Sequence, residues 1–191
     1  MQYISDINQI NTGDTMLVYT SDKRILPHLI HYFQKKKDEQ GGKYNHAGIF
    51  WWCYDVLMVV EADKWGITIT PFVEYTKNKI YIEFLCLKPK FEVDGVEYGK
   101  FMLPFAGKTR YDKFGLFSEL LKFEAWQETG KKVWIGQRYF NKNKFMCGEF
   151  VGFVYNHFQE GIFKPSNCSP VDLFLSDKFE HQLIIKSFIN T

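Results

Sequence analysis

The sequence predicts an α+β fold in which an antiparallel sheet packs against a buried helix. Two observations lead to this prediction. Short apolar runs rich in β-branched and aromatic residues recur between residues 15 and 87, close enough in sequence to pair as hairpins. After a polar break at 141–144, apolar residues lie three, four, seven, eight and eleven positions beyond Cys147, which is helical spacing.

Length and composition indicate one globular domain covering residues 1–191. Apolar residues make up 46% and charged residues 24% of the chain, an ordinary globular balance. Aromatic residues, at 18%, are numerous enough to build a bulky core and also to line an apolar groove. The net charge of +2, without a long basic block, gives no reason to expect nucleic acid or an anionic membrane as a partner.

The N-terminal residues are polar and lack the apolar run of a signal peptide, so we expect a cytoplasmic protein unless other machinery delivers it elsewhere. No apolar stretch approaches the length of a membrane span. The four cysteines are far apart in sequence and should be reduced. Because no Cys or His pairs have the spacing of zinc ligands, we expect neither a metal nor a cofactor.

The first half of the chain reads as strands with one helix among them. The helix covers Ile25 to Lys36 and ends in a run of lysines, and a Gly-Gly break follows at 41–42. Pro71 and Pro89 stop two of the strands. The predicted strands are Thr15–Thr20, Tyr44–Trp52, Val56–Ala62, Gly66–Thr70 and Lys79–Leu87.

The short link between the second and third of these strands predicts an antiparallel hairpin. If its turn is centred on Cys53 and Tyr54, His46 lies directly opposite Glu61 on the same face of the sheet. A slip of one residue would place the two side chains on opposite faces, so their proximity is a hypothesis about register.

The second half is less regular. Residues 91–103 are ambiguous, and Val93–Val96 fits the tip of a hairpin. We expect a loop at 107–111, a helix from Asp112, the Cys147 helix as far as about residue 161, and a short helix at 171–175 with Ser169 or Asp172 at its cap. A final strand is predicted at Leu183–Phe188.

Cys147 falls in the first turn of its predicted helix, where free backbone N–H groups and the positive end of the helix dipole stabilise a thiolate. The plainer alternative is a buried core cysteine. Cys53 and Cys86 lie in apolar strand-like runs and read as core, whereas Cys168, in a loop rich in Pro and Ser, is the rival nucleophile.

His46 and Glu61 supply what a nucleophilic cysteine needs. In a thiol hydrolase an imidazole takes the thiol proton and later protonates the leaving group, and a third polar group orients the imidazole. The backbone N–H of Cys147 is the simplest donor to the oxyanion. Each residue alone also has a structural explanation. His46 could be a core histidine whose hydrogen bonds are satisfied, and Glu61 could mark the end of a strand that emerges into solvent.

The order of the motifs adds to this reading. The sequence has YNHAGI at 44–49, VVEA at 59–62, YD at 111–112, FMCGEFV at 145–151 and SPVDL at 169–173. This order resembles the YiiX/YebB-like branch of the NlpC/P60 superfamily, which are circularly permuted papain-like cysteine hydrolases whose His strand precedes the Cys helix. The resemblance covers about residues 13 to 188.

The resemblance implies Cys147 as nucleophile, His46 as general base and Glu61 as the group that orients His46. Tyr111 matches a tyrosine that lies near the active-site cleft in such proteins, and it could be an oxyanion donor, a substrate contact or a packing residue. We take Tyr111 and Tyr44 as the candidate substrate-binding residues. Many relatives have Ser where this chain has Gly148, a departure that should leave the nucleophile intact because only a backbone N–H is needed there. The regions 91–103 and 131–144 match nothing in the family and are candidates for a lid over the cleft.

These observations predict a cysteine hydrolase that cleaves an amide bond, in a peptidoglycan-like peptide or an N-acyl compound, through a thioester. One alternative is a lipid acyl hydrolase or acyltransferase of the same fold. Others are a non-catalytic domain that binds a peptide or lipid, and a structural component with an incidental cysteine. The sequence does not specify the oligomeric state.

Overall fold

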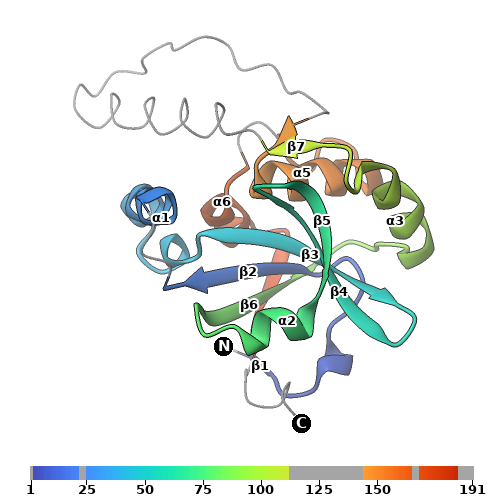
Figure 1. Ribbon diagram of the computed structural model, residues 1–191, viewed down its shortest axis with the longest axis horizontal. Helices are drawn as coiled ribbons and strands as arrows, with labels where there is room; N and C mark the ends of the chain where they lie inside the picture. Colours follow the sequence, from blue (N-terminus) through green and yellow to red (C-terminus); the bar gives the residue numbers. More distant parts are fainter. Residues whose placement is uncertain (1, 22–24, 112–143, 165–167, 185–191) are drawn as a thin grey trace.

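A computed structural model describes residues 2–21, 25–111, 144–164 and 168–184 of the chain (Figure 1). The strands are β1 Gln2–Ile4, β2 Thr15–Thr20, β3 His46–Cys53, β4 Val56–Asp63, β5 Gly66–Pro71, β6 Tyr81–Pro89, β7 Arg110–Tyr111, β8 Lys144–Phe145 and β9 Phe179–Ile184. The helices are α1 Ile25–Lys37, α2 Phe72–Lys77, α3 Gly95–Met102, α5 Cys147–Phe158 and α6 Pro170–Leu175. Short 3-10 turns lie at Ile7–Gln9, Gly41–Lys43 and Leu103–Phe105.

Seven of the strands form one sheet in the order β1-β9-β6-β2-β3-β4-β5, and β7 pairs with β8. Within the large sheet, β1 and β9 are parallel and the other neighbours are antiparallel. The predicted α+β class with a largely antiparallel sheet is therefore confirmed. The five strands predicted between residues 15 and 87 lie within a few residues of their predicted bounds, whereas strand β1 was not predicted.

The central strands are buried on both faces of the sheet. Ile49 and Val60 belong to one hydrophobic cluster together with apolar residues of α5. Their chain neighbours Phe50 and Val59 belong to a second cluster, which includes residues of α2. Since successive side chains of a strand point to opposite faces, α5 and α2 cover opposite faces of the sheet (Figure 1).

The hairpin of β3 and β4 has a different register from the predicted one. Glu61 lies opposite Gly48, and Cys53 opposite Val56, so the turn is Tyr54–Asp55. Tyr54 occupies the left-handed region with φ 54°, which few residues other than Gly, Asn and Asp adopt, and this is why the turn was placed one position too early. The shift of the pairing is two residues, so Glu61 stays on the predicted face of the sheet.

Residues 95–102 form a helix, so the predicted hairpin tip at 93–96 is wrong. The Asp94 carboxylate accepts hydrogen bonds from the backbone N–H groups of Val96 at 2.8 Å and Glu97 at 3.0 Å, an N-cap that starts α3. Tyr98 stacks on Phe158, the last residue of α5, at the opposite end of this helix from Cys147. The helix predicted from Asp112 and most of the 131–144 region lie outside the described residues.

Tyr155 fixes helix α5 to the start of β2. Its buried hydroxyl donates to the carbonyl oxygen of Gly13 at 2.5 Å and lies 2.6 Å from Oγ1 of Thr15. Tyr155 lies two turns along the helix from Cys147, so this anchor also determines where the N-terminus of α5 sits over the sheet. The short helix α6 begins as predicted, with Ser169 at its N-cap.

Candidate active site

Cys147 is the first residue of α5 and is 6% exposed. The N-terminus of the helix is capped, because Oε2 of Glu149 accepts a hydrogen bond from the backbone N–H of Met146 at 2.9 Å. In the first turn the backbone N–H groups have no partner within the helix, and they carry the positive end of its dipole. The predicted position of the cysteine at a helix N-terminus is therefore correct.

Gly148 allows a second segment to pack directly on this first turn. A Cβ atom at residue 148 would lie 2.4 Å from the carbonyl oxygen of Cys168 and 2.9 Å from Cα of Ser169. Only a residue without a side chain fits under such a close backbone approach. Gly148 thus has a packing reason in this chain.

His46 is the first residue of β3, and its imidazole connects the cysteine to Glu61. Nε2 of His46 makes a short hydrogen bond with Oε2 of Glu61. The His46 side chain also interacts electrostatically with Cys147. Because Nε2 is engaged by the carboxylate, Nδ1 is the ring nitrogen that remains for the thiol. The structure thus brings together the three residues that the sequence singled out.

The surroundings of His46 favour its protonated form. Burial alone lowers the pKa of the imidazole, but the negative charge of Glu61, the interaction with Cys147 and the hydrogen bond to Glu61 outweigh it, and the pKa of His46 lies well above its usual value. An imidazolium between a carboxylate and a sulfur is the arrangement in which a cysteine can be held as a thiolate.

The carboxylate of Glu61 has a partner on each oxygen. Its side chain is 8% exposed, Oε2 faces His46, and Oε1 accepts a short hydrogen bond from the hydroxyl of Tyr75 in α2. A buried carboxylate needs such partners. Sequence reasoning missed Tyr75. The only local signal was its helical spacing from Phe72 in a short segment after a strand-ending proline.

The two tyrosines predicted to bind substrate have different positions. Tyr44 is 1% exposed, and its hydroxyl donates to Oε1 of Glu83 at 2.5 Å, so we correct its assignment from substrate binding to the core. The backbone of Tyr111 pairs with Phe145, two residues before Cys147. Its side chain lies outside the described part of the structure, and its contact with substrate stays a prediction.

The remaining cysteines have structural surroundings. Cys86 is fully buried, and its Sγ lies 3.5 Å from Oδ2 of Asp14. Burial, followed by the negative charges of Asp172 and Cys147, raises the pKa of Cys168, which favours the unreactive thiol. Cys53 is partly exposed at the end of β3.

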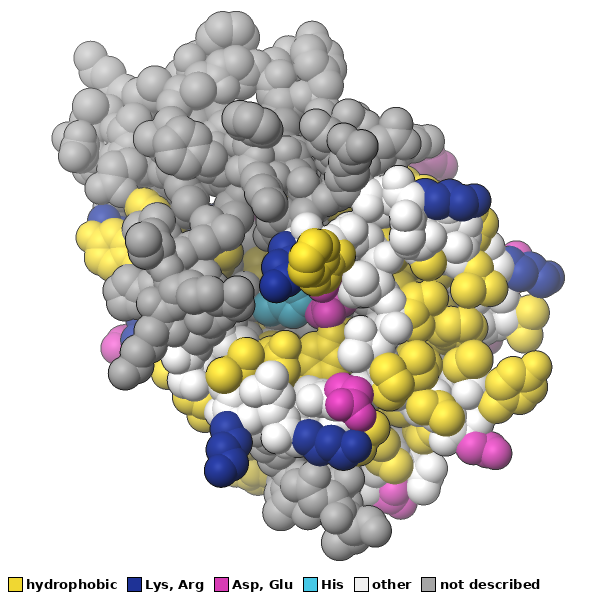
Figure 2. Space-filling model, in the orientation of Figure 1, with side chains coloured by type: hydrophobic (Ala, Val, Ile, Leu, Met, Phe, Trp, Pro, Cys, Tyr) yellow, Lys and Arg dark blue, Asp and Glu magenta, His cyan; other side chains and the backbone are white. Residues whose placement is uncertain are grey.

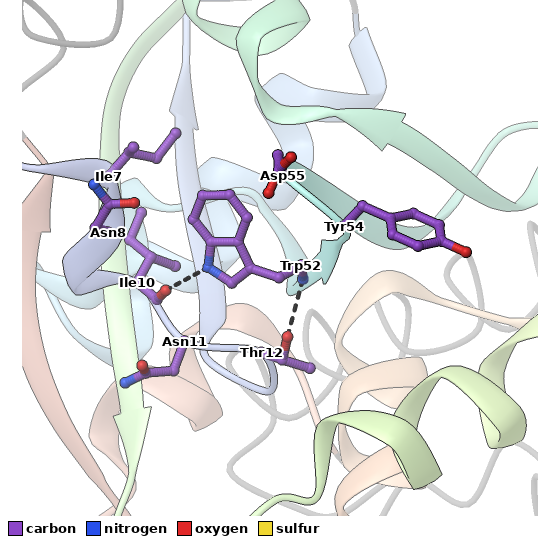
Figure 3. A pocket seen from close by; sticks show the side chains of 8 residues that line it. All are labelled: Ile7, Asn8, Ile10, Asn11, Thr12, Trp52, Tyr54 and Asp55. Carbon is purple, nitrogen blue, oxygen red and sulfur yellow. Dashed lines mark hydrogen bonds between the residues drawn. The ribbon is translucent and has the colours of Figure 1, made fainter.

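Figure 2 shows a histidine side chain in a recess of one face of the molecule, beside acidic and apolar side chains. A separate open hollow of about 490 Å³ lies at the other end of β3, where Trp52 and Tyr54 line it together with residues 7–12 (Figure 3). Trp52 is six residues along the strand from His46, or roughly 20 Å, so this hollow is not part of the site.

Within the described residues, no three His, Cys, Asp or Glu side chains are grouped as a metal ion would require. In the same part of the chain, none of the helices combines the length and the apolar character needed to cross a bilayer.

No family model and no curated protein sequence matches the chain. Among solved structures, the crystal structure of the metalloprotein yiiX from Escherichia coli O157:H7 is similar, with 15% sequence identity and a TM-score of 0.49. The similarity covers 91% of this chain and 96% of that one. The class that fold and site define together is an α+β protein with a linked Cys, His and Glu.

Proposed function

We propose that this protein is a cysteine hydrolase that transfers an acyl group to water through a thioester on Cys147. The observation that carries the proposal is the position of His46, whose imidazole is hydrogen-bonded to Glu61 and also interacts electrostatically with Cys147. A thiol, a base and an orienting carboxylate in this linkage are the parts that covalent acyl transfer requires.

In the first half-reaction the thiolate of Cys147 attacks the carbonyl carbon and forms the C–S bond. The oxyanion of the tetrahedral intermediate accepts a hydrogen bond from the backbone N–H of Cys147, which lies in the first turn of α5 and has no acceptor within the helix. When the C–N bond breaks, the imidazolium of His46 gives its proton to the departing amine. The products are a neutral amine, a neutral imidazole and a thioester.

In the second half-reaction His46 takes a proton from a water molecule, whose oxygen attacks the thioester carbonyl. Breakage of the C–S bond releases the carboxylic acid and returns Cys147 as a thiolate beside an imidazolium. Glu61 keeps the imidazole in one tautomer through both steps by remaining bonded to Nε2.

The finer assignment is a permuted papain-like hydrolase of the YiiX/YebB-like branch that acts on an amide bond of a peptidoglycan-like peptide or an N-acyl compound. It is supported by the order of the motifs: the strand that carries His46 precedes the helix that carries Cys147, and both residues belong to one site. Tyr111 is proposed as a substrate contact, because its backbone pairs with the segment that leads into Cys147.

The test is to trap the acyl-enzyme. The protein is mixed with a p-nitrophenyl ester or an acyl p-nitroanilide, quenched with acid within seconds, and mapped by peptide mass spectrometry. We expect one acyl group on Cys147, no adduct in Cys147→Ala, and an unchanged yield in the matched thiol variant Cys53→Ser. Comparing aminoacyl with long-chain acyl donors separates a peptide amidase from a lipid acyl hydrolase.

Absence of any adduct on Cys147 across these donors, with the protein folded, would remove the proposal and leave a binding domain as the better account.

A further inference from the structure

Tyr75 extends the site beyond the three residues used so far. It comes from α2, on the face of the sheet opposite α5, and its ring belongs to the second hydrophobic cluster. Its hydroxyl donates to Oε1 of Glu61, the carboxylate oxygen that does not face His46. Cys147 belongs to the first cluster, so His46 and Glu61 link the two sides of the sheet.

The position of Tyr75 is set by rigid packing. Phe72, one turn earlier in α2, meets the rings of Phe50 and Phe84 edge-to-face with centroids 5.0 and 5.2 Å apart. The Tyr75 side chain also interacts electrostatically with Thr70, at the end of β5. The ring packing and the hydrogen bond to Glu61 together fix the phenol oxygen.

The tyrosine hydroxyl can act only as a donor toward Glu61. Burial, and then the charge of Glu61, raises the pKa of Tyr75 above its usual value, so the phenol keeps its proton at physiological pH. A carboxylate that accepts from Tyr75 on one oxygen cannot rotate without leaving that donor buried and unpaired. Its other oxygen thus stays aimed at Nε2 of His46.

We propose that Tyr75 is a positioning residue that fixes Glu61 in the geometry that holds His46 as an imidazolium beside Cys147. A catalytic role for Tyr75 rests on the proposed function, whereas its effect on the protonation of His46 does not. Among the described residues, the charged and titratable groups that face His46 are Glu61 and Asp63 from β4 and Cys147 from α5.

The test uses Tyr75→Phe, which keeps the ring and removes the hydroxyl. The control is Tyr98→Phe, since the hydroxyl of Tyr98 is also fully buried but has no hydrogen-bond partner within the described residues. NMR titration of the His46 ring should show its pKa lowered by about one unit in Tyr75→Phe, with alkylation of Cys147 at pH 7 slowed about tenfold. Tyr98→Phe should match the wild type in both measurements.

A Tyr75→Phe protein that folds and gives wild-type values for both measurements would overturn the inference, because a merely structural tyrosine affects stability alone. If Tyr75→Phe does not fold, Thr70→Val perturbs the same tyrosine. It should lower the pKa of His46 and slow the alkylation of Cys147 by smaller amounts. The wild type separates the two proposals. If its Cys147 reacts no faster than Cys53, the proposed function fails, whereas the role of Tyr75 is still decided by the titration of His46.

Discussion

Replacing Gly148 with alanine should destabilise the protein, although helix propensity alone predicts the opposite. A Cβ at this second residue of α5 would lie 2.4 Å from the carbonyl oxygen of Cys168 and 2.9 Å from Cα of Ser169, whereas real Cβ contacts essentially never fall below 3.0 Å. Both obstructing atoms belong to backbone, so they cannot swing aside as the tip of a side chain could. Either α5 or the 168–169 segment has to move.

The magnitude follows from two opposing contributions. Alanine gains at most about 1 kcal/mol over glycine from helix propensity. Overpacking a tight site costs about 1–3 kcal/mol, and a backbone obstruction belongs at the upper end of that range. We therefore expect a net loss of about 1–2 kcal/mol in the free energy of unfolding, which lowers Tm by about 2–8 °C for a chain of this size. Alkylation of Cys147 should slow as well, because the first turn moves.

The assay is urea unfolding followed by circular dichroism, with Gly95→Ala as the matched control. Gly95 is the first residue of α3, and a Cβ there meets Thr12 at 3.5 Å, an ordinary van der Waals contact. This control should be as stable as the wild type or slightly more so. A Gly148→Ala protein that equals or exceeds the wild type in stability would refute the reasoning about the close approach.

Three further predictions concern the support of the site. Tyr155→Phe should cost about 1–3 kcal/mol in urea unfolding, because it removes the buried hydroxyl that bonds to Gly13 and Thr15; an unchanged midpoint would show that this anchor contributes nothing. Burial raises the pKa of Asp14 from 3.8 to about 6. The folded state thus holds this proton more tightly than the unfolded state, so the contribution of Asp14 to stability is complete below about pH 4 and is lost as the pH rises through about 6, a change of about 3 kcal/mol. Asp14→Asn should flatten the curve of stability against pH between 4 and 6, and a curve parallel to that of the wild type would contradict this assignment. Tyr111→Ala should raise KM for an acyl substrate while the alkylation rate of Cys147 by a small reagent stays the same; equal losses in both would assign Tyr111 to the fold of the site instead.

Much of the site could be predicted because it depends on short-range patterns. The helical spacing after Cys147 places the cysteine at a helix start, and strand alternation places Glu61 on its correct face even though the register was wrong by two residues. The exact pairing depends on a turn in which Tyr54 adopts a positive φ, and no Gly or Asn marks that position in the sequence.

Other features depend on tertiary contacts that no local pattern encodes. Tyr75 reaches Glu61 because α2 packs through Phe72 onto the sheet. Tyr44 adjoins the His46 motif in sequence but is buried among core side chains. The sequence marks the start of α3, since Asp94 followed three residues later by Glu97 is a capping pattern, but the Asp-Gly pair at 94–95 also fits the tip of a hairpin.

The central claim is that His46 and Glu61 activate Cys147, and the relative alkylation rates of the four cysteines test it most directly. The protein is treated with limiting iodoacetamide at pH 7, and each cysteine peptide is quantified by mass spectrometry over time. Cys147 is only 6% exposed, whereas Cys53 is partly exposed, so accessibility alone predicts that Cys53 reacts first.

We predict instead that Cys147 reacts roughly tenfold or more faster than Cys53, Cys86 and Cys168. His46→Ala should abolish this advantage, and His157→Ala, which removes an exposed histidine at the other end of α5, should leave it intact. If all four cysteines react slowly, or if Cys147 keeps its rate in His46→Ala, the linkage of thiol, imidazole and carboxylate is not an activated catalytic site.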